Sequence, residues 1–336
     1  MNFRPAILKI FGAGLLFSLV GGAQAWALSF GMPLHCNYGV DCFIQNYVDD
    51  APSSDARDYH CSGLTYHGHK GTDFRLRNFT QMQQGVDVLA AADGTVLRVR
   101  NDAPDTGLDA GREAVGDKEC GNGLVIAHAD GYESQYCHMK QGSIRVTPNA
   151  AVKAGDVLGQ VGYSGMTEFP HVHFELRRDG HTVDPFNTSA PSIAVECGTV
   201  PVSAWSDNTA LPYRDGVILD AGFADHVPQQ DHVIAPLIPA TQINATAPML
   251  IFWVSSMGMK AGDQLVMRIL SPTGETLVEK LTLIPSFKAT WFQFIGKNLH
   301  APLPAGDYSG EASILRDGKP LPSGQSRTVL KIVTTQ

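Results

Sequence analysis

Short stretches in which apolar and polar residues alternate follow one another along most of the chain, and glycine-containing turns separate them. Between about residues 68 and 186 this period-two pattern predicts a series of β-strands. Two apolar runs within Val86–Val99 flank Asp93-Gly94, which predicts a hairpin. A second hairpin is expected from Leu124–His128 and Tyr132–His138. Because no window has the 3.6-residue apolar period of a helix, we expect an all-β fold with antiparallel sheets.

A second domain is predicted at residues 241–336, after a linker at 199–240 that is rich in proline, aspartate and alanine. Gln264–Leu270 and Glu275–Leu283 alternate on either side of a Ser-Pro-Thr-Gly turn, which is a strong hairpin signal. Further strands are expected at Tyr308–Leu315 and Arg327–Val333. About seven short strands in roughly 100 residues are typical of a β-sandwich of the immunoglobulin type. This sequence region has no cluster of metal ligands or nucleophiles, so we expect it to bind or pack rather than to catalyse.

Length and composition agree with a two-domain organisation. The chain has 336 residues, of which 43% are hydrophobic and 17% charged, so it is neither a disordered nor a low-complexity chain. Its formal net charge is −8 at pH 7. This acidic surplus argues against a protein that binds nucleic acid through its phosphates.

The first 27 residues have the pattern of a secretory signal peptide. Arg4 and Lys9 precede an apolar stretch at about residues 10–22, and small residues at positions 23, 25 and 27 offer cleavage sites. The stretch is shorter than the roughly 20 apolar residues that a membrane span requires, and an uncleaved anchor is the alternative. We expect a secreted or periplasmic protein with no stable membrane insertion after cleavage. Its mature charge would be −10, because the segment carries two cations and no anions.

Six cysteines lie within the first 197 residues. In an oxidising compartment an even number favours disulfides, here in the first domain and in an N-terminal segment at 28–67. Cys36 and Cys42 are close enough for a local loop, and Cys120 and Cys137 flank the second predicted hairpin, so we expect these two pairs. A structural zinc site is the alternative, but the chain has no C-x-x-C spacing. The six are Cys36, Cys42, Cys61, Cys120, Cys137 and Cys197.

Eight of the twelve histidines lie between His60 and His181. His69 and Asp73 are four residues apart in a context that reads as a turn entering a strand. Along a straight strand they would lie about 13 Å apart, too far for bonds of about 2.0–2.2 Å to one zinc ion. Gly71 could let the chain bend and bring them together. Alone, this spacing is weak evidence of a site, because it is common by chance.

The segment Phe169–Leu176 carries two more histidines. Strand periodicity places His171, His173 and Glu175 on one face and only apolar residues on the other. An H-x-H pair on an exposed strand is more often solvated surface than a site, but the apolar opposite face favours a groove here.

Two further histidines lie on the predicted strands of the second hairpin. His138 ends a strand, where side chains project from a scaffold, although alone it would be interpreted as a hydrogen-bonded structural residue. We assign His128 a structural role, because its strand mainly builds the sheet.

Together these residues match a catalytic zinc site, which has three nitrogen or oxygen ligands and an open fourth position. His69, Asp73 and either His171 or His173 meet this requirement. The remaining histidines are then available for proton transfer, since imidazole titrates near neutral pH.

The order H-x3-D, Y-x-H and P-H-x-H-F-E inside a glycine-rich all-β stretch resembles the lysostaphin-type, LytM-like zinc peptidases, over roughly residues 68–186. The resemblance implies a zinc metallopeptidase domain at 68–198 with an antiparallel sheet. It implies that Zn²⁺ is held by His69, Asp73 and His173. It also implies that His138 and His171 are the catalytic histidines, which position or deprotonate the attacking water and stabilise the oxyanion. The substrate would be the peptide stems of bacterial peptidoglycan, whose cross-links or bridges this family cleaves.

Two features depart from the family pattern. Phe169 stands where the family commonly has glycine before the P-H-x-H motif, so its ring could narrow the groove or offer a stacking surface. The stretch Asn101–Asn122 is long and acidic and is expected to be a surface loop. This loop or the segment Cys36–Cys61 could shield the site.

Two other functions fit parts of the pattern. A catalytically silent module that binds peptidoglycan or activates a partner is one alternative, but the complete set of five residues favours an enzyme. An unrelated exported zinc hydrolase, such as an amidase, fits the ligand types and fits the strand-borne motifs less well. The pattern does not distinguish D-Ala to diaminopimelate cross-links from glycine-containing bridges, and it predicts no oligomeric state.

Overall fold

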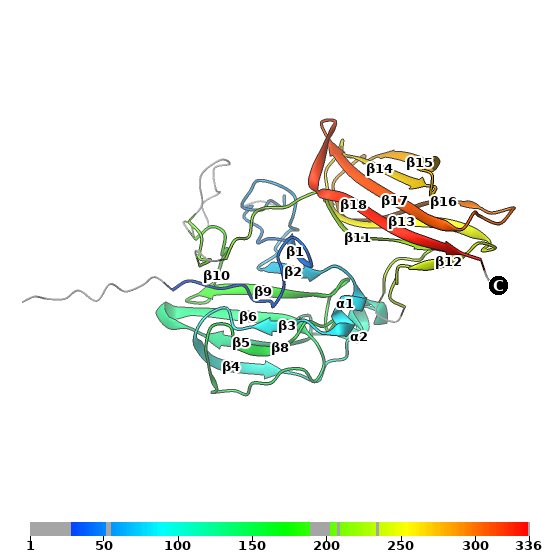
Figure 1. Cartoon of the computed structure of the whole chain (residues 1–336). Coiled ribbons are helices and arrows are strands. Elements are labelled where there is room, and N and C mark those ends of the chain that lie inside the picture. The colour runs from blue at the N-terminus through cyan, green and yellow to red at the C-terminus, as the bar shows by residue number, and fades with distance from the viewer. Residues whose placement is uncertain (1–27, 52–54, 189–201, 207–208, 233–234, 335–336) are drawn as a thin grey trace, which may run out of the picture.

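The computed structural model describes residues 28–51, 55–188, 202–206, 209–232 and 235–334. The expected signal peptide at 1–27 lies outside these ranges. Figure 1 shows two β-rich domains, one formed by the blue-to-green part of the chain and one by the yellow-to-red part. Within the described ranges, the structure has no helix with the length and apolar character needed to cross a membrane.

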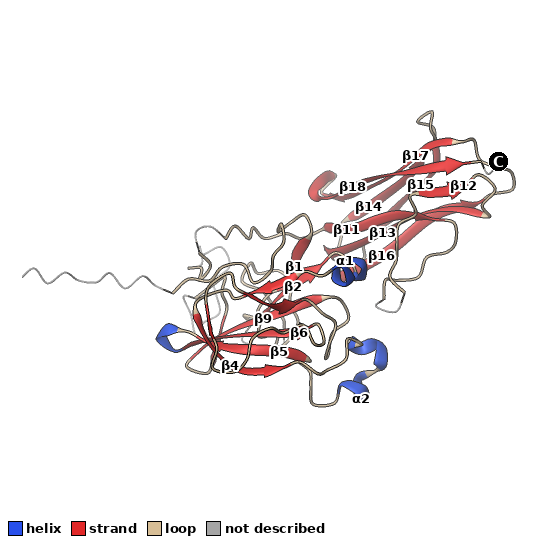
Figure 2. Ribbon diagram, turned by 60° about the horizontal axis from the view of Figure 1, so that its bottom comes forward, coloured by secondary structure: helices blue, strands red, loops and turns tan. Residues whose placement is uncertain are grey.

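The first domain is built on one large antiparallel sheet (Figure 2). Its strands, in sheet order, are β1 (Cys42–Asn46), β2 (Thr72–Leu76), β9 (His171–Arg178), β6 (Tyr132–Met139), β5 (Asn122–Ala127), β4 (Gly94–Arg100) and β7 (Ala151–Val152), and β10 (His181–Val183) also pairs with β9. A small second sheet pairs β3 (Asp87–Leu89) with β8 (Val157–Gln160). The short helical elements are α1 (Phe79–Gln84), η1 (Gly107–Ala110), α2 (Arg112–Val115) and η2 (Ala129–Gly131). The all-β prediction is confirmed.

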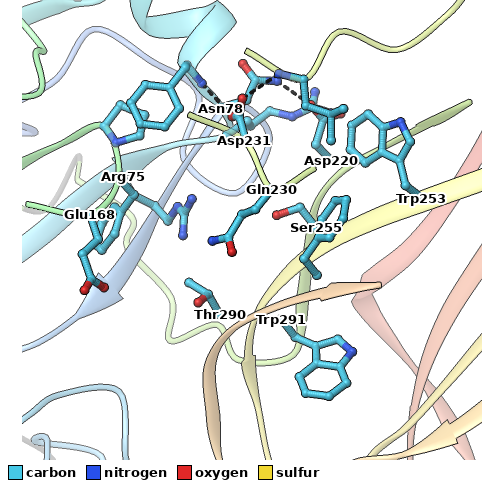
Figure 3. A pocket seen from close by; sticks show the side chains of 16 residues that line it. Arg75, Asn78, Glu168, Asp220, Gln230, Asp231, Trp253, Ser255, Thr290 and Trp291 are labelled. Carbon is cyan, nitrogen blue, oxygen red and sulfur yellow. Dashed lines mark hydrogen bonds and ion pairs between the residues drawn. The ribbon is translucent and has the colours of Figure 1, made fainter. Parts of the chain in front are cut away.

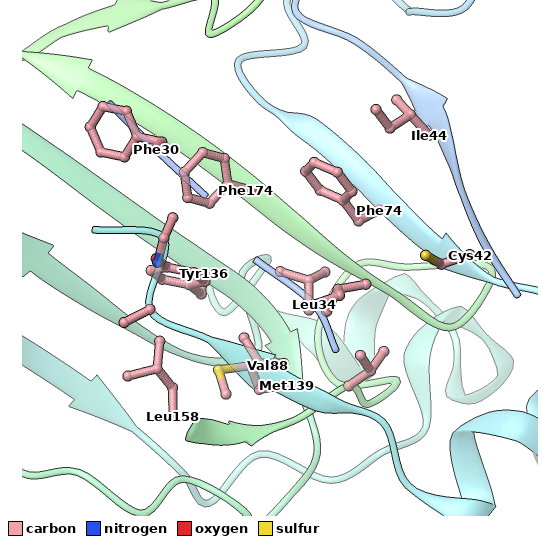
Figure 4. Packing of buried hydrophobic residues seen from close by; sticks show 14 of the residues in the cluster. Phe30, Leu34, Cys42, Ile44, Phe74, Val88, Tyr136, Met139, Leu158 and Phe174 are labelled. Carbon is pink, nitrogen blue, oxygen red and sulfur yellow. The ribbon is translucent and has the colours of Figure 1, made fainter. Parts of the chain in front are cut away.

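The core of the first domain is formed by one face of the large sheet together with the small sheet. Phe74, Tyr136 and Phe174 point into this core from β2, β6 and β9, and each is fully buried. Val88 and Leu158 join them from the small sheet (Figure 4). Because side chains alternate along a strand, the neighbouring residues of β2 and β9 point to the other face of the sheet.

The predicted hairpins have different outcomes. Strands β5 and β6 pair as expected, with Leu124 opposite Tyr136. The prediction of a hairpin at Asp93-Gly94 is wrong. The strands on either side of this turn pair with other strands, β3 with β8 and β4 with β5 and β7. The Asp93 carboxylate instead accepts hydrogen bonds of 2.8 Å from the Lys153 Nζ and the Ala154 backbone N. These bonds hold the segment between β3 and β4 as a corner that leads from the small sheet to the large one.

The N-terminal segment takes part in the large sheet. Strand β1, which lies inside the segment expected at 28–67, pairs with β2 along Cys42–Leu76 and Asn46–Asp73. The expected disulfides Cys36–Cys42 and Cys120–Cys137 are both present. Cys61 is disulfide-bonded as well, and Cys197 lies outside the described residues.

Short helical turns occur where the sequence predicted none. Helix α1 begins after Asn78, whose side chain accepts a 2.8 Å hydrogen bond from the Gln81 backbone N and so caps the helix. The segment 101–122, expected to be an acidic surface loop, contains η1 and α2. Such single turns have too few residues to show an apolar helical period.

The second domain consists of two sheets that share a core. The three-stranded sheet is β11 (Val217–Ala224), β13 (Met249–Met259) and β16 (Lys288–Asn298), and the five-stranded sheet is β12 (Gln242–Asn244), β18 (Lys319–Val333), β17 (Gly306–Arg316), β14 (Gln264–Leu270) and β15 (Thr276–Leu283). Phe223 and Phe252 of the first sheet and Ile314 of the second lie in the same buried cluster. The predicted β14–β15 hairpin is confirmed. The immunoglobulin-type topology stays a prediction.

The prediction of a linker at 199–240 is wrong in part, because this stretch contains β11. Strand β11 pairs with β13, from Val217 opposite Met257 to Ala224 opposite Ile251. Every residue of this strand except Ile218 is buried. The second domain therefore begins inside the stretch that its proline and aspartate content marked as a linker.

The two domains contact each other beside β1 and β2. Phe43 of β1 packs in one buried cluster with Leu219 and Met257 of the second domain. The Arg77 side chain donates a 2.7 Å hydrogen bond to the Leu219 carbonyl and lies 3.2 Å from the Asp220 carboxylate. The second domain is thus attached next to the strand that carries Asp73.

Candidate metal centre

Strands β2 and β9 bring three potential metal ligands together. Asp73 lies opposite His173 in the antiparallel register, so both side chains project from the same face of the sheet. Their Oδ1 and Nδ1 atoms are 2.9 Å apart. The His69 Nε2 lies 3.2 Å from the same Asp73 oxygen and 3.1 Å from the His173 Nδ1. These three residues form the group that the sequence pattern predicted, with His173 rather than His171 nearest to the other two ligands.

His69 and Asp73 meet because His69 is not on the strand. Strand β2 begins at Thr72, so His69 lies in the preceding turn and folds back over the strand. Gly71 permits the close approach of β9 at this turn. A Cβ atom there would lie 2.6 Å from the His173 ring and 2.7 Å from the Phe174 carbonyl oxygen.

The chemistry of these atoms fits a cation. The His69 Nδ1 lies 2.7 Å from the Tyr47 carbonyl oxygen. Because a carbonyl oxygen can only accept a hydrogen bond, the Nδ1 carries the hydrogen and donates it. In the neutral ring Nε2 then carries a lone pair, which points at the Asp73 carboxylate and the His173 Nδ1. Their separations are close to the roughly 3.4 Å expected between ligands at about 2.0–2.1 Å from a tetrahedral zinc ion.

The charges at the centre also favour a cation. Burial alone would raise the pKa of Asp73, but the electrostatic interactions with His69 and His171 and the hydrogen bonds from His171 and His173 outweigh it and hold that pKa well below its ordinary value. Burial would lower the pKa of His69, but the Asp73 charge outweighs it and raises that pKa. Asp73 is therefore ionised, as a carboxylate ligand must be.

The two other predicted histidines lie beside this group. The ring centroids of His138 and His171 are 4.6 Å apart, and the His171 Nε2 lies 3.5 Å from the Asp73 Oδ1. The His138 Nδ1 is 2.8 Å from the Ser164 carbonyl oxygen, and the His171 Nδ1 is 2.9 Å from the Phe169 carbonyl oxygen. Since each Nδ1 donates to a carbonyl, each Nε2 remains available at the centre.

His138 is held in an unusual backbone conformation. Its φ angle is 62°, and its backbone N donates a 2.8 Å hydrogen bond to the Cys120 carbonyl, next to the Cys120–Cys137 disulfide. Burial, followed by the charges of His171 and His173, holds the pKa of His138 well below its ordinary value. His138 is therefore neutral, and because its Nδ1 donates to the Ser164 carbonyl, its Nε2 carries the lone pair.

Several residues that support the centre were missed by the sequence analysis. Asn46 and Tyr47 come from the N-terminal segment. The Asn46 Nδ2 donates a 2.8 Å hydrogen bond to the Asp73 Oδ2, and the Tyr47 carbonyl accepts from His69. Thr167 places its Oγ1 3.1 Å from the His171 Nδ1. The available signal was a pair of polar residues, Gln45 and Asn46, that stands between the apolar residues at 42–44 and 47–48.

Other candidates do not join the centre. Glu175 shares the face of His173 but its carboxylate binds Arg177 at 3.2 Å. His128 has the structural role that was predicted, with its ring nitrogens 2.8 Å from the Asp93 carbonyl and 2.7 Å from the Ser134 hydroxyl. Cys36, Cys42 and Asp41 also lie together, but the two thiols form a disulfide and cannot ligate.

Phe169 provides a stacking surface beside the centre. Its ring centroid lies 4.5 Å from that of the His171 ring, and the Arg75 guanidinium carbon lies over the Phe169 ring, 4.7 Å from its centroid. Burial lowers the pKa of Arg75 to about 9, so its guanidinium remains charged at neutral pH.

The region that holds these residues matches a known family. Residues 67–185 match the sequence model of peptidase family M23. Over 128 residues the chain is 30% identical to the DD-carboxypeptidase/endopeptidase Mpg of Neisseria meningitidis serogroup B, which covers 38% of this chain and 24% of that protein. It is 29% identical over 123 residues to the peptidoglycan DD-endopeptidase ShyA of Vibrio cholerae, which covers 37% of this chain and 23% of that protein.

In the two curated relatives, the similarity is confined to one part of the protein. The chain spans about a quarter of the length of these two curated relatives. Among solved structures, the catalytic domain of the prophage-encoded M23 protein EnpA from Enterococcus faecalis is 28% identical, covering 43% of this chain and 92% of that chain with a TM-score of 0.29. The five predicted site residues all lie within residues 67–185, the region that matches the M23 family model.

Proposed function

We propose that residues 67–185, which form a peptidase M23 domain, act as a zinc metalloendopeptidase that hydrolyses peptide cross-links or bridges of bacterial peptidoglycan. The observation that carries this proposal is the convergence of His69, Asp73 and His173 on one point, with His138 and His171 beside it. Relatives named as peptidoglycan DD-endopeptidases support the substrate class.

In this proposal zinc is held by the His69 Nε2, the Asp73 Oδ1 and the His173 Nδ1. When bound, zinc supplies a Lewis acid that polarises the scissile carbonyl. The Asn46 and Tyr47 hydrogen bonds to Asp73 and His69 orient these ligands and fix the tautomer of His69.

The two remaining histidines have complementary roles. His138 is neutral and presents its Nε2, so it can accept a proton from the attacking water. The His171 Nε2 lies 3.5 Å from the Asp73 Oδ1, where it can donate to the developing oxyanion when it carries a proton, and the proton that His138 takes from the water can return to the leaving amine. Both side chains are buried, which strengthens their electrostatic effect on the reacting atoms.

The decisive experiment incubates the purified mature protein with isolated sacculi and identifies the released muropeptides by mass spectrometry. We expect release that stops with a chelator and returns when zinc is added. Release that a chelator does not affect would overturn the zinc assignment. Binding to sacculi without any release would instead identify a catalytically silent peptidoglycan-binding module.

We further propose that the protein is exported to a periplasm or beyond. The signal-peptide pattern of the first 27 residues supports this location. The disulfides Cys36–Cys42 and Cys120–Cys137 support it as well, because such bonds form and persist in oxidising compartments. Protease accessibility of the chain in spheroplasts, compared with intact and lysed cells, tests this location.

A further inference from the structure

A polar pocket lies between the two domains, next to the metal centre. Its volume is about 310 Å³. One wall comes from β2, the turn after it and the segment before β9, and includes Arg75 and Phe169. The other wall comes from the second domain and includes Trp253 and Trp291. Figure 3 shows the Arg75 guanidinium and the Gln230 amide pointing into this pocket.

Arg75 links the pocket to the reaction site. It lies two residues after Asp73 on the same face of β2, and it is opposite His171 in the register of β2 and β9. Residues that face each other in antiparallel strands are about 4.5–5.5 Å apart at Cα. The Phe169 ring contacts both groups, with its centroid 4.5 Å from that of His171 and 4.7 Å from the Arg75 guanidinium carbon. A group bound to Arg75 would therefore lie next to His171, close to the reacting atoms.

The Arg75 guanidinium is buried without an ion pair at contact distance, and the Asp231 carboxylate, which also lines the pocket, acts on it only from further away. The residue is 5% exposed. Its Nε donates a 3.1 Å hydrogen bond to the Leu76 carbonyl, and its Nη1 donates to the Gln45 side chain. Among the described residues, Arg75 forms no ion pair and its Nη2 makes no hydrogen bond. Because burying a charge without a contacting counter-charge is unfavourable, the buried Arg75 guanidinium points to a ligand of opposite charge.

The acidic groups around the pocket are already engaged or exposed. The Asp220 carboxylate lies 3.2 Å from Arg77 and also accepts a hydrogen bond from Asn78. The two Asp231 oxygens accept from the Leu237 and Phe79 backbone N atoms, at 2.7 and 3.0 Å. Glu168 is exposed at the rim. None of these carboxylates lies within ion-pair distance of Arg75 in the described structure.

We propose that this pocket is a subsite for a free carboxylate of the peptide stem beside the cleaved bond, and that Arg75 is its specificity-determining residue. This inference rests on the proposed hydrolysis of peptidoglycan. The planar guanidinium suits a carboxylate, because two of its N–H groups can donate in parallel. The aromatic wall from Trp253 and Trp291 would contact the aliphatic part of the stem. The second domain then has a defined role, since it closes one side of the subsite.

The test compares two cross-linked muropeptide dimers that differ at one position. The position is the carboxyl group of the residue that supplies the amino group of the cleaved bond. In one dimer this group is a free carboxylate, and in the other it is a carboxamide. For the zinc-loaded full chain we expect kcat/KM to be about ten- to a hundredfold higher for the acid, as for a charge-assisted hydrogen bond. The R75M variant should lower the rate on the acid to near that on the amide, and R75K should retain part of the preference. R98M, which removes an exposed cation of β4, is the matched control and should keep the full preference.

A binding measurement separates this subsite from catalysis. The linear product stem, as acid or carboxamide, is titrated into the full chain while tryptophan fluorescence is followed, because Trp253 and Trp291 line the pocket. We expect the acid to bind about tenfold more tightly to the unmodified protein, a result that does not depend on the folding of any variant. Equal cleavage of both dimers by the unmodified protein would overturn the subsite and leave the proposed function standing. If neither dimer is cleaved, the proposed function fails and the subsite with it.

Discussion

The Asn46 side chain donates a 2.8 Å hydrogen bond to the Asp73 Oδ2, the oxygen of that carboxylate that does not face His69 and His173. The two residues are partners in the β1–β2 register, and both are buried. Asn46 lies outside the segment that matches the M23 family model. The edge strand β1 therefore supports a centre whose three candidate ligands all lie within residues 67–185.

This hydrogen bond predicts that N46A weakens zinc binding. Without the donor, the Asp73 carboxylate loses the bond that orients it, and the zinc affinity should fall about ten- to a hundredfold. Competition with a chromophoric chelator measures this affinity. N298A, which removes an exposed asparagine of β16, should leave it unchanged, and an unchanged affinity in N46A would show that β1 does not support the centre.

Close packing at Gly71 predicts that G71A disrupts the centre. The added Cβ would lie 2.6 Å from the His173 ring, so His173 or the β9 backbone must move. We expect zinc stoichiometry to fall and the free energy of unfolding to drop by about 1–3 kcal/mol, as for an overpacked site. Metal analysis and urea denaturation measure the two effects. G63A is the matched control, because its Cβ would have only an ordinary 3.6 Å contact with Phe287.

Local patterns predicted the parts of this centre that depend on neighbouring residues. The alternation of β9 placed His171 and His173 on one face, because side-chain direction follows from strand periodicity. The same reasoning failed at Asp93-Gly94, because a turn signal does not specify which strands pair. Likewise it missed Asn46, whose role depends on the pairing of β1 with a strand 26 or more residues later. The interdomain pocket at Arg75 depends on how two domains meet, which no local period encodes.

The Cys120–Cys137 disulfide predicts a link between oxidation and activity. It precedes His138 directly, and the Cys120 carbonyl accepts the backbone hydrogen bond of His138. The C120A/C137A variant should lose about 2–4 kcal/mol of stability and most of its peptidase activity, while zinc binding at His69, Asp73 and His173 persists. Thermal unfolding, muropeptide release and metal analysis measure the three quantities. The C36A/C42A variant, which lacks the other disulfide, is the control. If it loses as much activity, the Cys120–Cys137 disulfide has no specific role in positioning His138.

A pair of buried carboxyl groups predicts how stability depends on pH. Burial, with the charges of Asp58 and Asp49, raises the pKa of Asp50 to about 6, and burial with the Asp50 charge raises that of Asp184 well above its ordinary value. The Oδ2 atoms of Asp50 and Asp184 are buried without a hydrogen-bond partner in the described structure.

Because the folded state holds these protons more tightly than the unfolded state, their contribution to stability is complete below about pH 4 and is lost as the pH rises through about 6. D184N keeps an acceptor for the Phe186 backbone N and removes one charge. It should stabilise the protein by about 1–3 kcal/mol at pH 8 and by less at pH 4.5. Urea denaturation across this pH range measures the difference. A stabilisation by D184N that is the same at both pH values would contradict the shared burial of the two acids.

The five histidine and aspartate residues should separate into two groups by their effect on zinc. H69A, D73A and H173A each remove a converging donor atom, so zinc stoichiometry and activity should both be lost. H138A and H171A remove groups whose Nδ1 atoms bind carbonyls and whose Nε2 atoms face the centre. These two variants should retain most of the zinc and lose at least about a hundredfold in kcat, as expected for removal of a general acid or base. H128A is the matched control, because His128 binds Asp93 and Ser134 away from the centre. Full activity in H138A, with folding and zinc content intact, would exclude His138 from the reaction and leave His171 as the remaining proton-transfer group.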